Sequence, residues 1–237
     1  MTVTCLGHSG MVIETDDATL IFDYYIDPAG IIPQILARAK RLYVFVSHSH
    51  RDHLNPEIFD WDIYVSEIQY IIANECRRKL ARSRNLDAFS IHFLHHDEDW
   101  SDTRIAVRAF DSTDVGVSFL VSIGEKRVFH AGDYTCWDFS EEHDAATVRK
   151  ARGDFHAILT RITQFAPEID VAMMPVVPNI GGDWAYGARE FLKSVRVAIF
   201  IPMHMWGRDR EATQWSLYQN PGYGLCVHVP AGQSIMV

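Results

Sequence analysis

The sequence lacks several features that would place it in whole classes of protein. No apolar run approaches the roughly 20 residues that a membrane span needs, and the chain does not start with a basic segment followed by an apolar signal core. We therefore expect a cytoplasmic protein that uses no membrane. Basic residues are also few, because 22 lysines and arginines stand against 31 acidic residues and leave a net charge of −9. This balance argues against a broad nucleic-acid surface.

Cysteine is scarce as well, with four residues spread widely along the chain and no Cys-x-x-Cys pair. Free thiols in a reducing compartment are the expectation. The chain also lacks a Pro/Gly/Ser-rich linker, a low-complexity tract and a repeat of fixed period. With 237 residues, 48% of them hydrophobic, we expect residues 1–237 to form a single domain with a substantial core.

The most informative stretch that is present is His-Ser-His-Arg-Asp-His, residues 48–53, directly after the apolar run 42–46. The apolar run predicts a buried strand. Three imidazoles and a carboxylate at the end of a strand are unfavourable in a hydrophobic core. They are, however, good ligands for zinc, iron or manganese. In extended chain the two histidines of His-x-His point the same way, whereas Asp52 and His53 follow where the chain turns. The spacing therefore suggests two adjacent metals.

This motif resembles that of the metallo-β-lactamase superfamily of metal-dependent hydrolases. Two further places match the superfamily. The expected strand 126–130 runs into a Gly-Asp pair that ends at Asp133, and the expected strand 197–201 runs into Pro-Met-His, which ends at His204. The resemblance implies that Asp133 bridges two metals and that His204 is the last metal-binding histidine.

The first part of the chain predicts an antiparallel meander of strands 2–6, 10–15 and 19–23. Its Gly-His-Ser turn and the aspartate that ends the third strand are similar to one branch of the superfamily, that of the ascorbate-phosphate lactonases. The likeness implies that Asp23 lies behind the metals and fixes a histidine tautomer. His8 either reaches the mouth of the site or bonds to backbone as a turn residue.

The sequence departs from the superfamily in one place. A further histidine usually precedes the hairpin, where this chain has Asp-Ser-Thr-Asp, residues 111–114. The first metal would then have His48 and His50 but one ligand too few. Asp114 or Asp111 could fill the place, which would shift the preference from zinc toward manganese or iron. Alternatively the carboxylate caps a turn and the first metal is weak or absent. The ligands implied for the second metal are Asp52, His53 and His204, with Asp133 shared.

Strand and helix patterns occur in both halves of the chain, and with the resemblance they imply an α/β fold. This fold is the four-layer αββα sandwich, with two mixed sheets packed face to face and helices on the outer faces. A short strand 63–65 and a helix over 66–80 are expected within this order, because Ile68, Ile71, Ile72, Cys76 and Leu80 repeat at helical spacing. Further helices are expected over 31–40, 141–163 and 183–195, and further strands over 104–110, 115–121, 171–176, 225–229 and 234–237.

The implied function is hydrolysis of an ester, lactone or phosphoester of a small molecule. A divalent metal lowers the pKa of bound water from about 15.7 to roughly 7, so a metal-bound hydroxide would attack the substrate. Asp52 and Asp133 would orient it and take its proton. One or two divalent ions are expected, zinc first, with manganese or iron as alternatives. The candidate substrate contacts are Trp137, Trp206 and Tyr134, of which the two tryptophans follow proposed ligands by a few residues.

A second interpretation is a non-catalytic metal-binding or ligand-sensing protein on the same fold. It follows from the missing histidine of the first metal, because a fold does not fix a function. His50, by contrast, favours hydrolysis, because the redox members of the superfamily carry a carboxylate at that place. The oligomeric state has no signal in the sequence.

Overall fold

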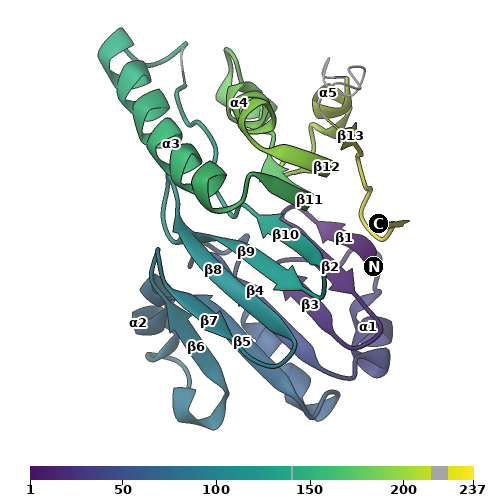
Figure 1. Ribbon diagram of the computed structural model, residues 1–237. Helices are drawn as coiled ribbons and strands as arrows, with labels where there is room; N and C mark the ends of the chain where they lie inside the picture. Colours follow the sequence, from purple (N-terminus) through teal and green to yellow (C-terminus); the bar gives the residue numbers. More distant parts are fainter. Residues whose placement is uncertain (140, 215–223) are drawn as a thin grey trace.

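The computed structural model describes residues 1–139, 141–214 and 224–237, and Figure 1 shows its elements. Two seven-stranded sheets organise the chain. The first sheet has the order β14 (Ser234–Met236), β1 (Thr2–Gly7), β2 (Gly10–Glu14), β3 (Thr19–Phe22), β4 (Leu42–Val46), β5 (Ile68–Ala73) and β6 (Ile91–Leu94). The second has the order β13 (Leu225–Cys226), β12 (Arg196–Met203), β11 (Glu168–Pro175), β10 (Lys126–His130), β9 (Val117–Ile123), β8 (Ile105–Asp111) and β7 (Asp99–Ser101).

Both sheets are mixed. In the first, β14, β1, β2 and β3 pair antiparallel, and β3, β4, β5 and β6 pair parallel. In the second, β7 to β10 pair antiparallel, whereas β10, β11, β12 and β13 pair parallel. The expected meander at the start of the chain is therefore confirmed, and so is the pair of mixed sheets.

The α-helices are α1 (Ile32–Arg38), α2 (Arg77–Leu80), α3 (Ala145–Phe165), α4 (Tyr186–Ser194) and α5 (Asp209–Thr213). Short 3₁₀ helices are η1 (Pro56–Ile63), η2 (Asn74–Cys76), η3 (Leu86–Ala88) and η4 (Pro178–Ile180). Helix α3 contacts β8, and α4 contacts β12, so both lie against the second sheet, whereas α1 lies by the first (Figure 1). This arrangement confirms the αββα sandwich. No helix in the described part of the chain is long and apolar enough to cross a membrane.

The core between the sheets follows from strands that are apolar on both faces. All five residues of β4 are buried, as expected for a parallel strand covered on both sides. Phe45 of β4 stacks on Phe22 of β3 with ring centroids 4.5 Å apart. It also meets Phe119 of β9 at 5.3 Å, which joins the two sheets. One hydrophobic cluster includes residues of both sheets.

Two predicted elements are wrong. The segment 66–80 is not one helix, because β5 occupies its first half and only the short η2 and α2 follow. Isoleucines that are three or four residues apart fit a helix face, but the run Ile-Gln-Tyr-Ile-Ile-Ala also suits a buried strand, and here it pairs with both β4 and β6. The expected strand 63–65 is instead the end of η1 and the turn after it.

Candidate metal centre

The polar motif residues meet at one edge of the two sheets, because each follows the end of a buried element. Asp23 follows β3, and residues 48–53 follow β4. Asp133 follows β10, and His204 follows β12. The carboxyl ends of the parallel strands within each sheet lie at the same edge, which brings these segments together. Two loops add a residue each, His8 from the turn between β1 and β2 and Asp114 from the connection of β8 and β9.

One group of possible metal ligands consists of His8, Asp52, His53 and His204, whose ligand atoms all lie within 4.8 Å of one another. His204 Nε2 lies 3.5 Å from Asp52 Oδ2, and His53 Nε2 lies 3.6 Å from the same oxygen. His8 Nε2 lies 3.0 Å from Asp52 Oδ2. Of the two expectations for His8, the structure shows the one that reaches the site, although its carbonyl oxygen also accepts from the His204 amide at 3.2 Å.

A second group consists of His48, His50, Asp114 and Asp133, again with ligand atoms within 4.8 Å of one another. His48 Nε2 and His50 Nδ1 are 3.0 Å apart, and Asp114 Oδ2 lies 3.8 Å from His50 Nδ1. Asp111 does not join this group. Its Oδ1 accepts from the neighbouring amide of Ser112 instead. Of the two loop carboxylates considered for the missing histidine, the structure brings Asp114 to the site.

Asp133 lies between the two groups and presents one oxygen to each. Its Oδ1 is 3.1 Å from His53 Nε2 and 3.3 Å from His204 Nε2. Its Oδ2 is 3.4 Å from His48 Nε2. A carboxylate that faces two sets of imidazole nitrogens in this way has the geometry of a bridging ligand.

The buried polar atoms of the centre fit a cation. Four atoms have no hydrogen-bond partner, namely His53 Nε2, Asp133 Oδ1 and both ring nitrogens of His204. Buried polar groups are rarely left unpaired, because each costs about 1–3 kcal/mol. Imidazole nitrogens and carboxylate oxygens around one point suit zinc or another divalent metal. The donor set therefore fits the metal that the motif predicts.

Asp23 lies behind the centre and fixes two histidines. Its Oδ2 lies 2.7 Å from His53 Nδ1, and its Oδ1 accepts from the Ser47 amide at 2.7 Å. Ser47 Oγ donates its only proton to Asp23 at 2.6 Å, so it accepts from His48 Nδ1 at 2.9 Å. Both imidazoles then carry a proton on Nδ1 and turn Nε2 toward the position where a metal would bind.

Burial and neighbouring charges both shift the pKa values of the residues in the centre. Burial disfavours ionisation of Asp23, but attraction to His53 and His130 outweighs it and keeps the carboxyl pKa below its usual value. Burial alone would lower the pKa of His53, whereas the Asp23 and Asp133 carboxylates raise it to about 10. For His48, burial and repulsion from His53 prevail and lower the pKa to about 4. The carboxylates thus make the centre attractive to positive charge.

The three aromatic candidates lie in different places. Trp206 is 51% exposed, and its ring centroid lies 4.5 Å from that of His8. Trp137 donates from Nε1 to the Asp133 carbonyl oxygen at 2.8 Å, and its ring lies 6.1 Å from His204. Both are therefore at the centre. Tyr134 is not available to a substrate, because it is fully buried, stacks on Phe155 and donates its hydroxyl proton to the Phe155 carbonyl.

Sequence reasoning missed Ser47, although its place next to the first motif histidine was a usable signal. It considered Asp23 alone as the group that fixes a tautomer. His130, three residues before Asp133, belongs to none of the groups of possible metal ligands among the described residues. Its Nε2 donates to the Ser9 carbonyl at 2.9 Å, and its ring stacks on Phe22.

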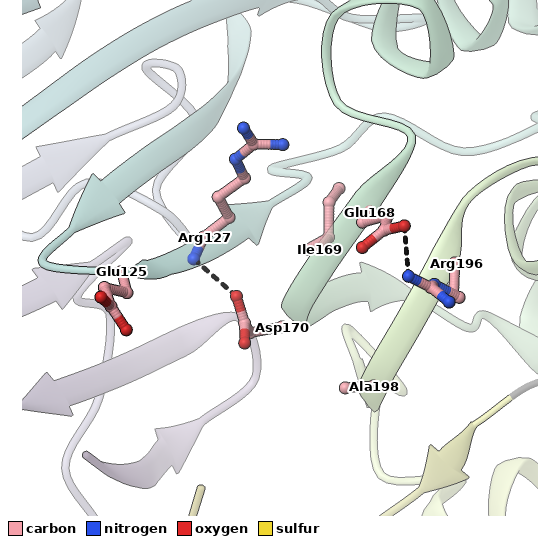
Figure 2. Close-up of a pocket in the computed structure, with 7 residues that line it drawn as sticks. All are labelled: Glu125, Arg127, Glu168, Ile169, Asp170, Arg196 and Ala198. Atoms are coloured by element: carbon pink, nitrogen blue, oxygen red, sulfur yellow. Dashed lines mark hydrogen bonds and ion pairs between the residues drawn. The ribbon is translucent and has the colours of Figure 1, made fainter.

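Another hollow, shown in Figure 2, lies at the opposite ends of β10, β11 and β12. Two of the three carboxylates that line it already have partners. The Asp170 carboxylate accepts from the Arg127 amide at 2.9 Å and from Lys126 Nζ at 3.0 Å. Glu168 pairs with Arg196. No histidine lines it, and it contains no cluster of possible metal ligands among the described residues. It is therefore a poor candidate for hydrolytic chemistry.

Known proteins resemble this chain in sequence and in fold. A family model described as a beta-lactamase superfamily domain matches residues 2–204. A protein of Desulforamulus reducens named UPF0173 metal-dependent hydrolase is 27% identical over 219 residues, which cover 86% of this chain and 84% of that protein. Among solved structures, Igni18, a metallo hydrolase from Ignicoccus hospitalis, has a TM-score of 0.71 at 17% identity and covers 99% of this chain and 97% of its own. The metallo-beta-lactamase fold protein YhfI from Bacillus subtilis has a TM-score of 0.65 at 12% identity, with 99% and 98% covered.

Proposed function

The chain belongs to the metallo-β-lactamase superfamily and is a metal-dependent hydrolase, and we propose that it hydrolyses an ester, lactone or phosphoester of a small molecule at two divalent metals. The observation that carries the proposal is Asp133, whose two oxygens face His48 on one side and His53 and His204 on the other. The likeness to ascorbate-phosphate lactonases remains a prediction within this proposal.

Each metal would have its own ligands besides Asp133. We assign His48, His50 and Asp114 to the first metal, whose ligand atoms lie within 4.8 Å of one another with those of Asp133. With this assignment the loop would provide the group that the missing histidine usually provides, which favours an enzyme over a sensing protein. Zinc is the proposed metal of both sites, and the extra carboxylate leaves manganese or iron as alternatives at the first. The ligands assigned to the second metal are Asp52, His53 and His204, with His8 beside them.

A divalent metal in such a site makes water more acidic and polarises the substrate oxygen. The residues of this chain then have separate tasks. Asp52 and Asp133 orient the attacking water and accept its proton, and His8 holds the Asp52 carboxylate in place at 3.0 Å. Asp23 keeps the His53 ring in the tautomer that binds metal. Trp137 and Trp206 flank the centre as walls for the substrate.

Further proposals concern the whole chain. We propose that residues 1–237 act as one domain, and the hydrophobic cluster that includes residues of both sheets supports this. We also propose a reducing cytoplasmic location, a small-molecule substrate and no nucleic-acid partner. The four free cysteines and the net charge of −9 support these assignments.

The activity can be tested on protein that has been stripped by a chelator and reloaded with zinc, manganese or iron. We expect hydrolysis of p-nitrophenyl acetate, a simple lactone or p-nitrophenyl phosphate only after reloading. Asp133→Asn should lower kcat/KM by about 10²–10⁴-fold, because a group that orients water and takes its proton is lost. Asp111→Asn, a carboxylate outside the centre, is the control and should stay within about twofold. Tight metal binding without turnover of any of the three substrates would instead favour the sensing protein.

The ligand assignment of the first metal can be tested separately by elemental analysis. Wild type and Asp111→Ala should each hold two metals per chain. Asp114→Ala should hold fewer, because a hard oxygen ligand of the first metal is lost. Equal content in all three proteins would contradict the assignment of Asp114, and a single metal in all three would leave only the second site.

A further inference from the structure

A cavity of about 280 Å³ lies beside the second metal group. Residues far apart in the sequence form it, from β1, the loop after β3, the end of β12 and the C-terminal segment. Its wall is mainly apolar, and the side chains that matter here are Ile26, Pro28, Met205, Trp206 and Val229. Small ligand pockets of proteins have this character, with an apolar wall and few polar groups.

The cavity adjoins the centre at His8, which lines the cavity and also belongs to the second metal group; Trp206 lines the cavity beside it. His8 Nε2 lies 3.0 Å from Asp52 Oδ2, and its ring centroid is 4.1 Å from that of His204. The Trp206 ring also packs against His8, at 4.5 Å, and its centroid lies 5.5 Å from that of His204. A group in the cavity would therefore lie one side chain away from the proposed second metal.

The charges of the cavity disfavour an anion. No lysine or arginine is among the described residues that line it, and its one acidic residue is Asp209. Burial raises the pKa of the Cys5 thiol, also in the wall, to about 11, and Asp209 adds to the shift. A phosphate or carboxylate group would lose its hydration there and gain no cation.

We propose that this cavity binds the apolar acyl chain of a neutral ester or lactone, so that phosphoesters are the less favoured of the candidate substrates. The inference rests on the proposed hydrolase function and narrows it. In the reaction water adds to the acyl carbon, the bond from that carbon to the ester oxygen breaks, and the oxygen leaves as an alcohol with a proton. The acyl chain stays in the cavity throughout.

The size of the cavity limits the chain. At about 280 Å³ it lies just below the roughly 300–1,000 Å³ of pockets for drug-sized ligands, so an acyl chain of a few carbons is the expected occupant. Each methylene moved from water into an apolar site should improve kcat/KM by about fourfold.

The first experiment compares p-nitrophenyl acetate, butyrate, hexanoate and phosphate on zinc-loaded protein. We expect kcat/KM to rise by about 15-fold from acetate to butyrate, a difference of two methylenes, to rise further to hexanoate, and to be lowest for the phosphate. Equal rates for the three carboxylic esters, or fastest turnover of the phosphate, would overturn the proposal.

A pair of matched variants tests whether the acyl chain binds in this cavity. Ile26 is 41% exposed and lines the cavity, whereas Ile63 is 74% exposed at the end of η1 and does not. Ile26→Trp should fill the cavity and reduce the preference for hexanoate over acetate to less than about threefold. Ile63→Trp should keep the full preference. Loss of preference in both variants, or in neither, would contradict this location.

A binding measurement separates this inference from the hydrolase function itself. Calorimetric titration of metal-loaded and metal-free protein with hexanamide and acetamide needs no turnover. Hexanamide should bind more tightly, and Ile26→Trp should remove the difference. If hexanamide binds more tightly in this way but no ester is hydrolysed, the cavity binds an apolar chain and the proposed hydrolase function is wrong. If esters are hydrolysed with no dependence on chain length and hexanamide shows no advantage, the function stands and the cavity proposal fails.

Discussion

At the scale of single residues, the proposed chemistry depends on groups that touch no substrate. The Asp23 carboxylate accepts from the Ser47 amide and hydroxyl and lies 2.7 Å from His53 Nδ1. Through Ser47 it also determines the tautomer of His48. Partners of this kind orient metal ligands and raise their basicity. Removing the charge of one buried residue should therefore affect both proposed metals.

The first prediction concerns Asp23→Asn, which keeps the shape of the side chain. We expect zinc affinity to fall by about 10–100-fold, because His53 loses the acceptor that holds its proton on Nδ1. Competition with a chromophoric chelator measures this. Asp62→Asn, which changes an exposed aspartate, is the control and should bind zinc as wild type does. Unchanged zinc affinity in folded Asp23→Asn would contradict the assigned role.

Sequence reasoning identified most residues of the centre, because each directly follows an apolar run and a strand end is easy to locate. It left Asp111 and Asp114 open, since either fits the spacing and only the path of the loop decides between them. It placed Tyr134 among the candidate substrate contacts. The direction of a side chain after a tight turn is not encoded in spacing, and this one points into the core against Phe155.

At the scale of elements, the centre requires the β8–β9 connection to approach the motif closely. The Val117 amide at the start of β9 donates to the Ser47 carbonyl oxygen at 2.9 Å, which joins the second sheet to the end of β4. Gly116 makes this approach possible. Its φ is +79°, and a Cβ there would overlap the Ser47 carbonyl oxygen and lie 2.5 Å from His48 Cβ.

The second prediction compares Gly116→Ala with Gly124→Ala. Both glycines have positive φ, but a Cβ at Gly124 would meet nothing within 4 Å. Gly124→Ala should therefore lose only about 1–2 kcal/mol of unfolding free energy from backbone strain. Gly116→Ala should lose a further 1–3 kcal/mol or so from overpacking, and its metal content should fall. Urea unfolding and elemental analysis measure the two effects, and equal losses in both variants would contradict the close approach.

Elements whose hydrophobic pattern fits only one type of secondary structure could be predicted. Elements whose pattern fits both a helix and a strand could not. The meander at the start of the chain consists of short apolar runs separated by clear turns, so its strands were predicted correctly. The run 68–73 has isoleucines that satisfy a helix and a strand equally. Its pairing with β4 and β6 decides the outcome, and this contact spans parts of the chain that local pattern cannot relate.

At the scale of the whole molecule, the two sheets are joined away from the centre by Asp102, in the turn between β7 and β8. Its Oδ2 accepts from the Tyr43 hydroxyl of β4 at 2.7 Å and from Arg41 at 3.1 Å. Its Oδ1 accepts from the amides of Arg104 and Ile105. Burial opposes ionisation, but these hydrogen bonds and the Arg41 charge outweigh it and lower the pKa of the Asp102 carboxyl.

The third prediction follows from this lowered pKa. A carboxyl whose pKa is lower in the folded protein than in the unfolded chain stabilises the folded state. This stabilisation is complete above the unfolded pKa of about 3.9, and it is lost as the pH falls through the pKa of the folded protein. Asp102→Asn should therefore lower the unfolding free energy by about 1–3 kcal/mol at pH 7. The difference from wild type should stay constant down to about pH 5 and shrink below about pH 4. Urea unfolding at several pH values measures it, and a difference that grows on acidification would contradict the account.

The central claim is that the chain holds two metals on either side of Asp133. Anomalous diffraction from zinc-loaded crystals tests it most directly. The account predicts two peaks about 3.5–4 Å apart, one against His48, His50 and Asp114 and the other against Asp52, His53 and His204. A single peak against the second set alone would contradict the two-metal claim, and no peak near Asp133 would contradict the proposed centre itself.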